Sequence, residues 1–273
     1  MRGKTVVITG ATGSIGRKLR AHFGSLGWTL RLLCLNPHND PEVQTADLSV
    51  YHESWAETFV GADAVIHLAG VPSPLATWEQ VQRLNIDMTL HVARAARSFG
   101  ARRIVFASSN WTMVGYRFSG ERLTTDLPPH PLNPYGVSKL IGERIGASLA
   151  AEGGVSFIAL RIGFAQHRPG NAPGAHMEYG SWGQAMWLSD RDLCHGMERA
   201  VLAEGVRFAV LNLMSDNPGM RWDIDTTRRV IGYAPRDGAA PVVTDAIRRA
   251  EDAARRMREL EAELDRSVMT SDW

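Results

Sequence analysis

The first residues of the chain hold the feature that most constrains its fold. The β-branched run Thr5–Thr9 has the composition of a buried strand. Three glycines follow at once, Gly10, Gly13 and Gly16, and a helix-like run comes next. In such a unit the first glycine allows a tight turn, the second lets the backbone approach a pyrophosphate, and the third lets the helix pack on the strand. The positive end of the helix dipole then faces the phosphates. A dinucleotide site is predicted here, although an ordinary glycine-rich turn shares this spacing.

Composition narrows the class of protein. The chain has 273 residues, 44% of them apolar and 22% charged, which is typical of a water-soluble α/β protein. A net charge of +1 gives no general reason to bind nucleic acid or an anionic membrane. Cys34 and Cys194 lie far apart, which suggests neither a disulfide framework nor a metal site and favours a reducing cytoplasm. We expect no signal peptide and no membrane span.

The expected second strand, residues 28–35, bears on cofactor choice. In a dinucleotide fold the end of this strand meets the adenosine ribose, where an acidic residue would favour NAD. The tip here, from Cys34 to Asn36, has no carboxylate. It has no arginine for a 2′-phosphate either, although Arg31 is near. This position therefore leaves NAD and NADP open.

Asp47 and Leu48 have two readings. An Asp-Leu pair in this setting commonly lies beside the adenine, whereas an aspartate is also a common N-cap, here for a helix expected over residues 51–60. The sequence leaves both open.

Polar residues gather after two expected strands. The strand over residues 64–70 ends in small residues, and residues 71–78 form a proline-containing loop well placed for substrate contact. The strand over residues 104–107 is followed directly by Ser108, Ser109 and Asn110. Ligands of open parallel sheets sit at such strand ends, so these side chains are candidate site residues.

A helix predicted to begin at Pro134 carries the clearest chemical pattern. Tyr135 and Lys139 are four residues apart and therefore share one face of that helix. An ammonium group near a phenol favours the phenolate, and an oxidised nicotinamide ring would add to that pull. The spacing alone is weak, because an exposed Tyr–Lys pair would look the same. It gains weight from the serine-rich strand end and the glycine turn upstream.

The remaining chain predicts further alternation of strands and helices. Asn85 falls within a long helix over residues 78–99, where a lone asparagine is usually solvated. A strand over residues 155–162 precedes a loop, residues 163–183, that looks placed over the substrate. Its histidines, His167 and His176, lack the spacing of metal ligands.

The C-terminal part predicts smaller elements. Asp190 and Asp192 are expected to be caps and dipole partners of a helix within residues 187–204, and a strand follows over residues 207–213. Residues 243–266 read as an amphipathic helix that is either solvated or bound to a partner.

The alternation predicts an α/β fold, a doubly wound parallel sheet with a small C-terminal lobe. We expect a single domain with a dinucleotide-binding core over about residues 1–162. Substrate loops and the small lobe would follow over about residues 163–240, and then the helix over residues 243–266.

Taken together, the motifs resemble the extended short-chain dehydrogenase/reductase family, also called the NAD-dependent epimerase/dehydratase family. The matching pieces are TGATGSIG (9–16), ADL (46–48), HLAG (67–70), Asn85, ASSN (107–110), PYGVSK (134–139) and LRIG (160–163). Their combination is specific, although no single piece is. The order SSN, YGVSK, RIG and WLSDRDL is similar to the uronate dehydrogenase branch.

The resemblance implies a Rossmann-type fold, a bound NAD or NADP, and roles for several residues. Tyr135 would be the general base, Lys139 would lower its pKa and hold the nicotinamide ribose, and Ser109, rather than Ser108, would contact the reacting oxygen. The implied cofactor-binding residues are Gly10, Thr12, Gly13, Ser14, Ile15, Gly16, Asn36, Asp47, Leu48, Leu68, Ala69, Gly70, Asn85, Tyr135, Lys139 and Ile162. The implied substrate-binding residues are Ser73, Ser108, Ser109, Asn110, Trp111, Phe164 and Arg168, and no metal is implied.

Three positions depart from the uronate dehydrogenase pattern. Trp111 replaces a histidine, Phe164 replaces a serine, and the carboxylate-binding arginine falls near Trp182, with Arg168 as a substitute. Aromatic faces suit the C–H surfaces of a sugar, or an aryl group, better than a carboxylate. The resemblance therefore supports the dehydrogenase chemistry more strongly than it supports a uronate substrate.

Three functions follow as hypotheses. The first is an NAD(P)-dependent oxidoreductase acting on a small sugar, sugar acid or related polyhydroxy alcohol. The second is a sugar or sugar-nucleotide epimerase or dehydratase that keeps its NAD bound, and the third is a non-catalytic protein on the same fold. The resemblance also implies a homodimer or higher homo-oligomer, built on helices 78–99 and the one from Pro134.

Overall fold

A seven-stranded sheet forms the centre of the molecule, with strand order β3-β2-β1-β4-β5-β6-β7 and every pair parallel. The computed structural model describes residues 3–166 and 170–269, and the side chains of the last helix as far as Leu264. The strands are β1 (Thr5–Thr9), β2 (Thr29–Cys34), β3 (Val43–Thr45), β4 (Ala64–His67), β5 (Arg103–Ser109), β6 (Ser156–Ile162) and β7 (Phe208–Leu213). The predicted doubly wound parallel sheet is confirmed, and its strand order reverses between β1 and β4, where such folds bind ligands.

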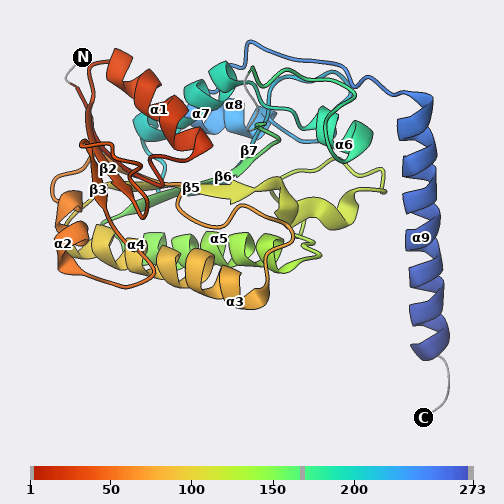
Figure 1. Ribbon diagram of the computed structural model, residues 1–273, viewed down its shortest axis with the longest axis horizontal. Helices are drawn as coiled ribbons and strands as arrows, with labels where there is room; N and C mark the ends of the chain where they lie inside the picture. The colour runs from red at the N-terminus through yellow and green to blue at the C-terminus, as the bar shows by residue number, and fades with distance from the viewer. Residues whose placement is uncertain (1–2, 167–169, 270–273) are drawn as a thin grey trace.

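Helices cover both faces of this sheet (Figure 1). One face carries α1 (Ser14–Ser25), α7 (Asp190–Leu202) and α8 (Asp225–Ile231), and the other carries α2 (Glu53–Ala56), α4 (Met88–Ser98) and α5 (Pro134–Glu152). The shorter elements are η1 (Glu57–Phe59), α3 (Trp78–Val81), η2 (Gln82–Asp87), η3 (Asn110–Tyr116) and α6 (Gly180–Ala185), and α9 (Asp245–Met269) is the last helix.

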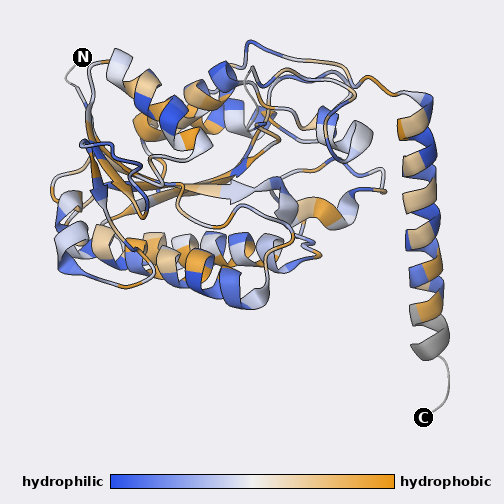
Figure 2. Cartoon of the chain, viewed as in Figure 1, coloured by the Kyte–Doolittle hydropathy of each residue, from blue (hydrophilic) through white to orange (hydrophobic). Residues whose placement is uncertain are grey.

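The hydrophobic core has two layers, because the strands are buried on both faces. Val6 and Ile8 of β1 point into the layer beneath α1 and α7, whereas Val7 points into the layer beneath α4 and α5. Figure 2 shows this as apolar strands between helices whose outer faces are hydrophilic. The β-branched run at the start of the chain is therefore the central strand of the sheet.

The structure extends β5 beyond its predicted end. Ser108 and Ser109 lie within the strand, paired with Arg161 and Ile162 of β6, instead of following it. The pattern missed this because both serines are polar, yet they are buried at the edge of a cavity. It also missed β3, a three-residue strand with one buried side chain.

Two helices are capped by residues other than the aspartates that the sequence offered. The helix expected over residues 51–60 begins at Glu53 and is capped by His52, while the Asp47 carboxylate accepts hydrogen bonds from the N–H and hydroxyl of Ser49. Ser189 caps α7 by accepting a hydrogen bond from the Asp192 N–H, while Asp190 and Asp192 lie in the first turn of the helix, where the helix dipole favours a negative charge.

The predicted helix over residues 78–99 is interrupted by η2, a π-helical turn that contains Asn85. Asn85 is only 4% exposed, so the expectation of a solvated asparagine is wrong. Single π-turns within helices occur frequently at functional sites, because they turn a side chain out of the regular helical register.

The last helix, α9, projects away from the sheet (Figure 1). It packs against α6, where the N–H and hydroxyl of Ser181 donate to the Glu251 carboxylate. The prediction of an amphipathic helix that exposes much of its surface is confirmed, with Met257 and Leu260 both exposed. Over the described part of the chain, no helix is both long and apolar enough to cross a membrane.

Arg103 connects strand β5 of the sheet to the end of α7, and a substitution there tests this connection. Its buried guanidinium donates to the carbonyls of Ala200, Val201, Ala203 and Val206, where α7 ends, and so supplies partners that a helix C-terminus lacks. Arg103→Met should lower the free energy of unfolding by about 3 kcal/mol, because several buried carbonyls lose their donors.

Urea unfolding measures this loss. The exposed neighbour Arg102, which pairs with Asp63 at the surface, provides the control: Arg102→Met should change stability by less than about 0.5 kcal/mol. Equal midpoints for the two variants would contradict the role given to Arg103.

Candidate active site

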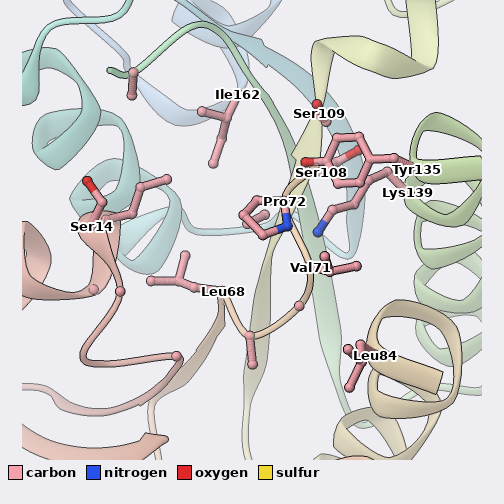
Figure 3. Close-up of a pocket in the computed structure, with 18 of the residues that line it drawn as sticks. Ser14, Leu68, Val71, Pro72, Leu84, Ser108, Ser109, Tyr135, Lys139 and Ile162 are labelled. Atoms are coloured by element: carbon pink, nitrogen blue, oxygen red, sulfur yellow. The ribbon is translucent and has the colours of Figure 1, made fainter. Parts of the chain in front are cut away.

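A cavity of about 860 Å³ opens where β1, β4, β5 and β6 end. The predicted glycine turn lines one end of it, through Gly10, Thr12, Gly13, Ser14, Ile15 and Gly16. Leu68, Ala69, Gly70 and Ile162 line its middle, as do Ser108, Ser109, Tyr135 and Lys139. Figure 3 shows the serines, the tyrosine and the lysine on one side of this pocket, with Ser14 on the opposite side and Leu68 and Pro72 between.

The glycine turn is shaped for a close backbone approach. Gly10 has φ +70°, and a Cβ there would lie 2.9 Å from the backbone nitrogen of Ala69. A Cβ on Gly16 would lie 2.4 Å from the carbonyl oxygen of Gly10, so α1 can pack here only without a side chain. The N-cap of α1, Gly13, makes no side-chain capping bond. The first N–H groups of the helix therefore fit the pyrophosphate of a dinucleotide.

The adenosine end carries a thiol where NAD-binding folds often carry a carboxylate. The Cys34 sulfur lies 2.9 Å from the Thr12 hydroxyl oxygen, and that hydroxyl also lies 3.0 Å from the carbonyl oxygen of Asn36. Burial raises the pKa of Cys34, but hydrogen bonds from Thr12 and nearby backbone N–H groups lower it further than burial raises it. Asn36, Asp47 and Leu48 line the same end of the cavity, as predicted.

Ser109, Tyr135 and Lys139, predicted from separate motifs, come together in the middle of the cavity. Burial raises the pKa of the Tyr135 phenol, and a hydrogen bond with Ser109 opposes that rise. The Lys139 ammonium nitrogen lies 5.8 Å from the centre of the Tyr135 ring. A phenol, a hydroxyl and an ammonium are thus within reach of one small substrate group.

Lys139 is a buried cation, 6% exposed. Burial lowers its pKa to about 8. Its ammonium lies 5.0 Å from the centre of the Phe106 ring, and no acceptor hydrogen-bonds it among the described residues. The hydroxyls of a nicotinamide ribose would fit as its missing acceptors.

A buried network that sequence reasoning missed lies one helical turn beyond Lys139. The Glu143 carboxylate accepts hydrogen bonds from Arg161 Nε at 2.9 Å and Nη2 at 2.8 Å, and from the Ser108 hydroxyl at 2.6 Å. Ser108 lines the cavity, but its hydroxyl proton is committed to Glu143. The signal was present in the sequence, because Glu143 follows Tyr135 and Lys139 at helical spacing.

Asn85 does not line the cavity; it holds the segment that does. Its side-chain oxygen accepts from the Val71 N–H at 2.8 Å, and its amide nitrogen donates to the Ser138 hydroxyl at 2.9 Å. The Gly70–Val71 backbone is thereby tied to α5. Ser73, a predicted substrate contact, is likewise not among the lining residues, although Pro72 and Pro74 on either side of it are.

We call the far end of the cavity the substrate end. Its lining residues are Trp111, Phe164, Gln166, His176, Glu178 and Tyr179. Trp111 adjoins the catalytic candidates, because its N–H donates to the Ser109 oxygen, and its ring meets that of Tyr179 edge-on at 5.2 Å. Trp111 and Phe164 were predicted individually as substrate contacts, and the sequence singled out His176 only as lacking the spacing of a metal ligand. The other three were foreseen only as part of a loop.

Of the remaining predicted residues, some line the cavity and others lie outside the described part of the chain. Asn110 lines the cavity, and its amide nitrogen donates to the carbonyl of Ile162. Arg168 and His167 lie outside the described residues. His176 shares a hydrogen bond with the Gln166 side chain at 3.0 Å, and the described residues hold no group of three His, Cys, Asp or Glu side chains that could bind a metal.

A doubly wound parallel sheet, a glycine turn and a Ser–Tyr–Lys set facing one cavity define a nicotinamide-dependent class of enzyme. The model of the NAD dependent epimerase/dehydratase family matches residues 6–165, and the chain belongs to this family, the extended short-chain dehydrogenases/reductases. The family predicted from the sequence is confirmed, and the chain is an NAD(P)-dependent dehydrogenase.

Similar proteins cover nearly the whole chain. NAD-dependent glucose-6-phosphate dehydrogenase of Haloferax volcanii is 36% identical over 86% of this chain and 94% of its own length. L-arabinose 1-dehydrogenase (NAD(P)(+)) of the same organism is 34% identical over 87% and 98%. The structure of a mutant uronate dehydrogenase from Agrobacterium tumefaciens, complexed with NAD, is 30% identical and superposes with a TM-score of 0.73 over 90% and 88%.

The buried ammonium of Lys139 should destabilise the cofactor-free protein. A lysine in the unfolded chain has a pKa near 10.5, whereas that of Lys139 is about 8, so between these values the unfolded chain binds more protons. Stability from this group therefore rises with pH over that window, and below pH 8 the full cost of about 3 kcal/mol is present.

Lys139→Met should remove that cost while keeping an apolar stem against Phe106. We expect its free energy of unfolding at pH 7, without cofactor, to exceed that of the unsubstituted protein by about 2 kcal/mol. The difference should shrink as the pH rises from 8 toward 10.5. Urea unfolding at several pH values measures it, and a variant that is less stable at pH 7 would refute the assignment.

Glu143→Gln should be costly, because it leaves the Arg161 guanidinium buried without its charge partner. A loss of about 3 kcal/mol in unfolding free energy is expected, as for other broken buried pairs. The double variant Glu143→Leu with Arg161→Met should recover most of that loss. If the double variant is as unstable as the single one, the pair does not explain the cost.

Proposed function

We propose that this dehydrogenase oxidises the anomeric hydroxyl of a small sugar or sugar acid, with Tyr135 as the general base. The observation that carries the proposal is the meeting of Ser109, Tyr135 and Lys139 beside the glycine turn in one cavity. The printed names of the similar proteins add to it, because all three act on sugars or sugar derivatives and one is a 1-dehydrogenase.

The proton would leave the substrate through Tyr135. Ser109 would hold the reacting oxygen by a hydrogen bond, and Tyr135 would take the proton from that oxygen as the carbonyl of the lactone forms. A buried phenol is a poor base, since burial raises its pKa, so the nearby Lys139 charge is needed to stabilise the phenolate. The nicotinamide, when bound, supplies the acceptor for the hydride.

The cofactor would span the cavity from the adenosine end to Lys139. We assign the pyrophosphate to the N–H groups around Gly13 and Ser14, the adenine to Asp47 and Leu48, and the nicotinamide ribose to Lys139. Leu68, Ala69, Gly70 and Ile162 would pack along its middle. Asn85 would act through the Val71 backbone and touch no cofactor atom.

Some expectations remain proposals about the whole molecule. The α4 and α5 helices lie side by side on one face of the sheet (Figure 1), and we propose this face as the interface of a homodimer. We also propose that the chain divides into a dinucleotide-binding core, a small lobe and a C-terminal helix, and that the protein is cytoplasmic. Arg168 stays a candidate substrate contact.

Tyr135→Phe tests the function. It should lower the rate of cofactor reduction with sugar substrates by about 10²–10⁴-fold, since it removes the group that takes the proton. Cofactor binding should survive, because the ring still fills its place. Tyr51→Phe is the matched control: Tyr51 is not among the residues that line the cavity, its ring packs against Trp55 and His91, and turnover should be unchanged.

Two results would count against this proposal. Undiminished turnover in Tyr135→Phe would remove the general base. NAD that stays bound through purification, with sugar interconversion and no net change in absorbance of the reduced cofactor, would favour an epimerase or dehydratase.

A further inference from the structure

The charges that line the cavity are unequally distributed between its two ends. Among the described residues of the substrate end, Glu178 is the one with an acidic side chain, and none is a lysine or arginine. Tyr179 stays neutral there, since burial raises the pKa of its phenol and the negative charge of Glu178 raises it further. His176 shares a hydrogen bond with the side-chain oxygen of Gln166.

The nearest described cations are committed elsewhere. Arg117 does not line the cavity: its guanidinium donates to the Tyr179 carbonyl, stacks on Phe118 and lies 5.8 Å from the centre of the Tyr179 ring. Lys139 faces the middle of the cavity beside Tyr135. Among the described residues that line the substrate end, no arginine or lysine would neutralise a carboxylate or phosphate group of the substrate.

The backbone that carries Glu178 is fixed by close packing. Gly183 of α6 lies so near that a Cβ on it would be 1.9 Å from the Glu178 carbonyl oxygen. Tyr179, the next residue, adopts φ +67° just before α6 begins. These constraints fix the backbone from which the exposed Glu178 side chain extends, directly before Tyr179 of the Trp111–Tyr179 pair.

A neutral sugar suits this environment. Its hydroxyl groups can donate charge-assisted hydrogen bonds to a carboxylate, and its C–H faces can pack on the rings of Trp111, Phe164 and Tyr179. An anionic sugar meets like-charge repulsion instead, and that repulsion strengthens wherever the cavity excludes water.

We propose, resting on the proposed function, that the substrate is an uncharged aldose and that Glu178 determines this specificity. Its carboxylate accepts hydrogen bonds from sugar hydroxyls remote from the anomeric carbon and repels uronates and sugar phosphates. Glu178 is thus a specificity-determining residue outside the Ser109–Tyr135–Lys139 set.

The test compares matched sugars that differ only in charge. Initial rates of cofactor reduction are measured for galactose with galacturonate, and for glucose with glucuronate and glucose 6-phosphate, each with NAD and with NADP. We expect kcat/KM for the neutral sugar to exceed that of its uronate by about tenfold or more, as two like charges a few ångströms apart imply.

Glu178→Gln separates charge from shape, because it removes the charge and keeps the size. The ratio of kcat/KM between neutral sugar and uronate should fall about fivefold or more, with the uronate rising and the neutral sugar falling. Glu204→Gln, at an exposed glutamate outside the cavity lining, should leave both unchanged. Added salt should speed uronate oxidation by the unsubstituted protein and have little effect in Glu178→Gln.

The outcomes distinguish this inference from the function beneath it. A preference for uronate or sugar phosphate, especially one lost in Arg168→Ala, would overturn the inference and leave the sugar dehydrogenase standing. A ratio unchanged in Glu178→Gln would overturn the role of Glu178. If no sugar of either charge reduced NAD or NADP, the proposed function would fall and this inference with it.

Discussion

The candidate active site depends on how closely α5 lies against the sheet. Two glycines make the approach possible: a Cβ on Gly142 would lie 2.4 Å from the Phe106 ring, and one on Gly146 would lie 2.2 Å from the Phe157 ring. Any larger residue at either position would push the helix outward. Because Tyr135 and Lys139 project from the same face of α5, that shift would carry both away from Ser109. The position of the phenol is thus set by packing two and three turns away.

Two charged side chains of this helix are buried, and only one of them is paired with an opposite charge among the described residues. Glu143 is fully paired by the guanidinium of Arg161 and by Ser108, so its charge fastens the helix to the centre of the sheet. Lys139, one turn earlier, has no such partner among the described side chains. Its charge is felt nearby: burial, and then the Lys139 charge, lower the pKa of His67 to about 3. On the proposed function, Lys139 is a cation whose partner is the cofactor, and it is kept at a cost to the stability of the empty protein.

Local signals in the sequence were sufficient for the glycine turn and the Tyr135–Lys139 pair, because each is defined by spacing within one segment. The sheet followed from the alternation of apolar runs. What could not be predicted depends on partners distant in sequence. Asn85 looked solvated because its acceptors and donors, Val71 and Ser138, belong to other elements. Ser189 was overlooked as a cap in favour of two aspartates, one of which is buried against residues of a later loop.

The lining of the substrate end could likewise be predicted only in part. The sequence indicated that aromatic residues replace polar ones at Trp111 and Phe164, which argued against a carboxylate. It could not show that Glu178 reaches the same cavity, since that depends on the turn into α6. At the opposite end, backbone N–H groups and the dipole of α1 are available to balance the charge of a pyrophosphate, and no lysine or arginine of the described lining is needed there. With backbone dipoles at one end, Lys139 in the middle and a carboxylate at the other, the cavity is electropositive toward the glycine turn and electronegative toward the substrate end. That polarity matches a cofactor whose phosphates lie far from a substrate that carries no charge of its own.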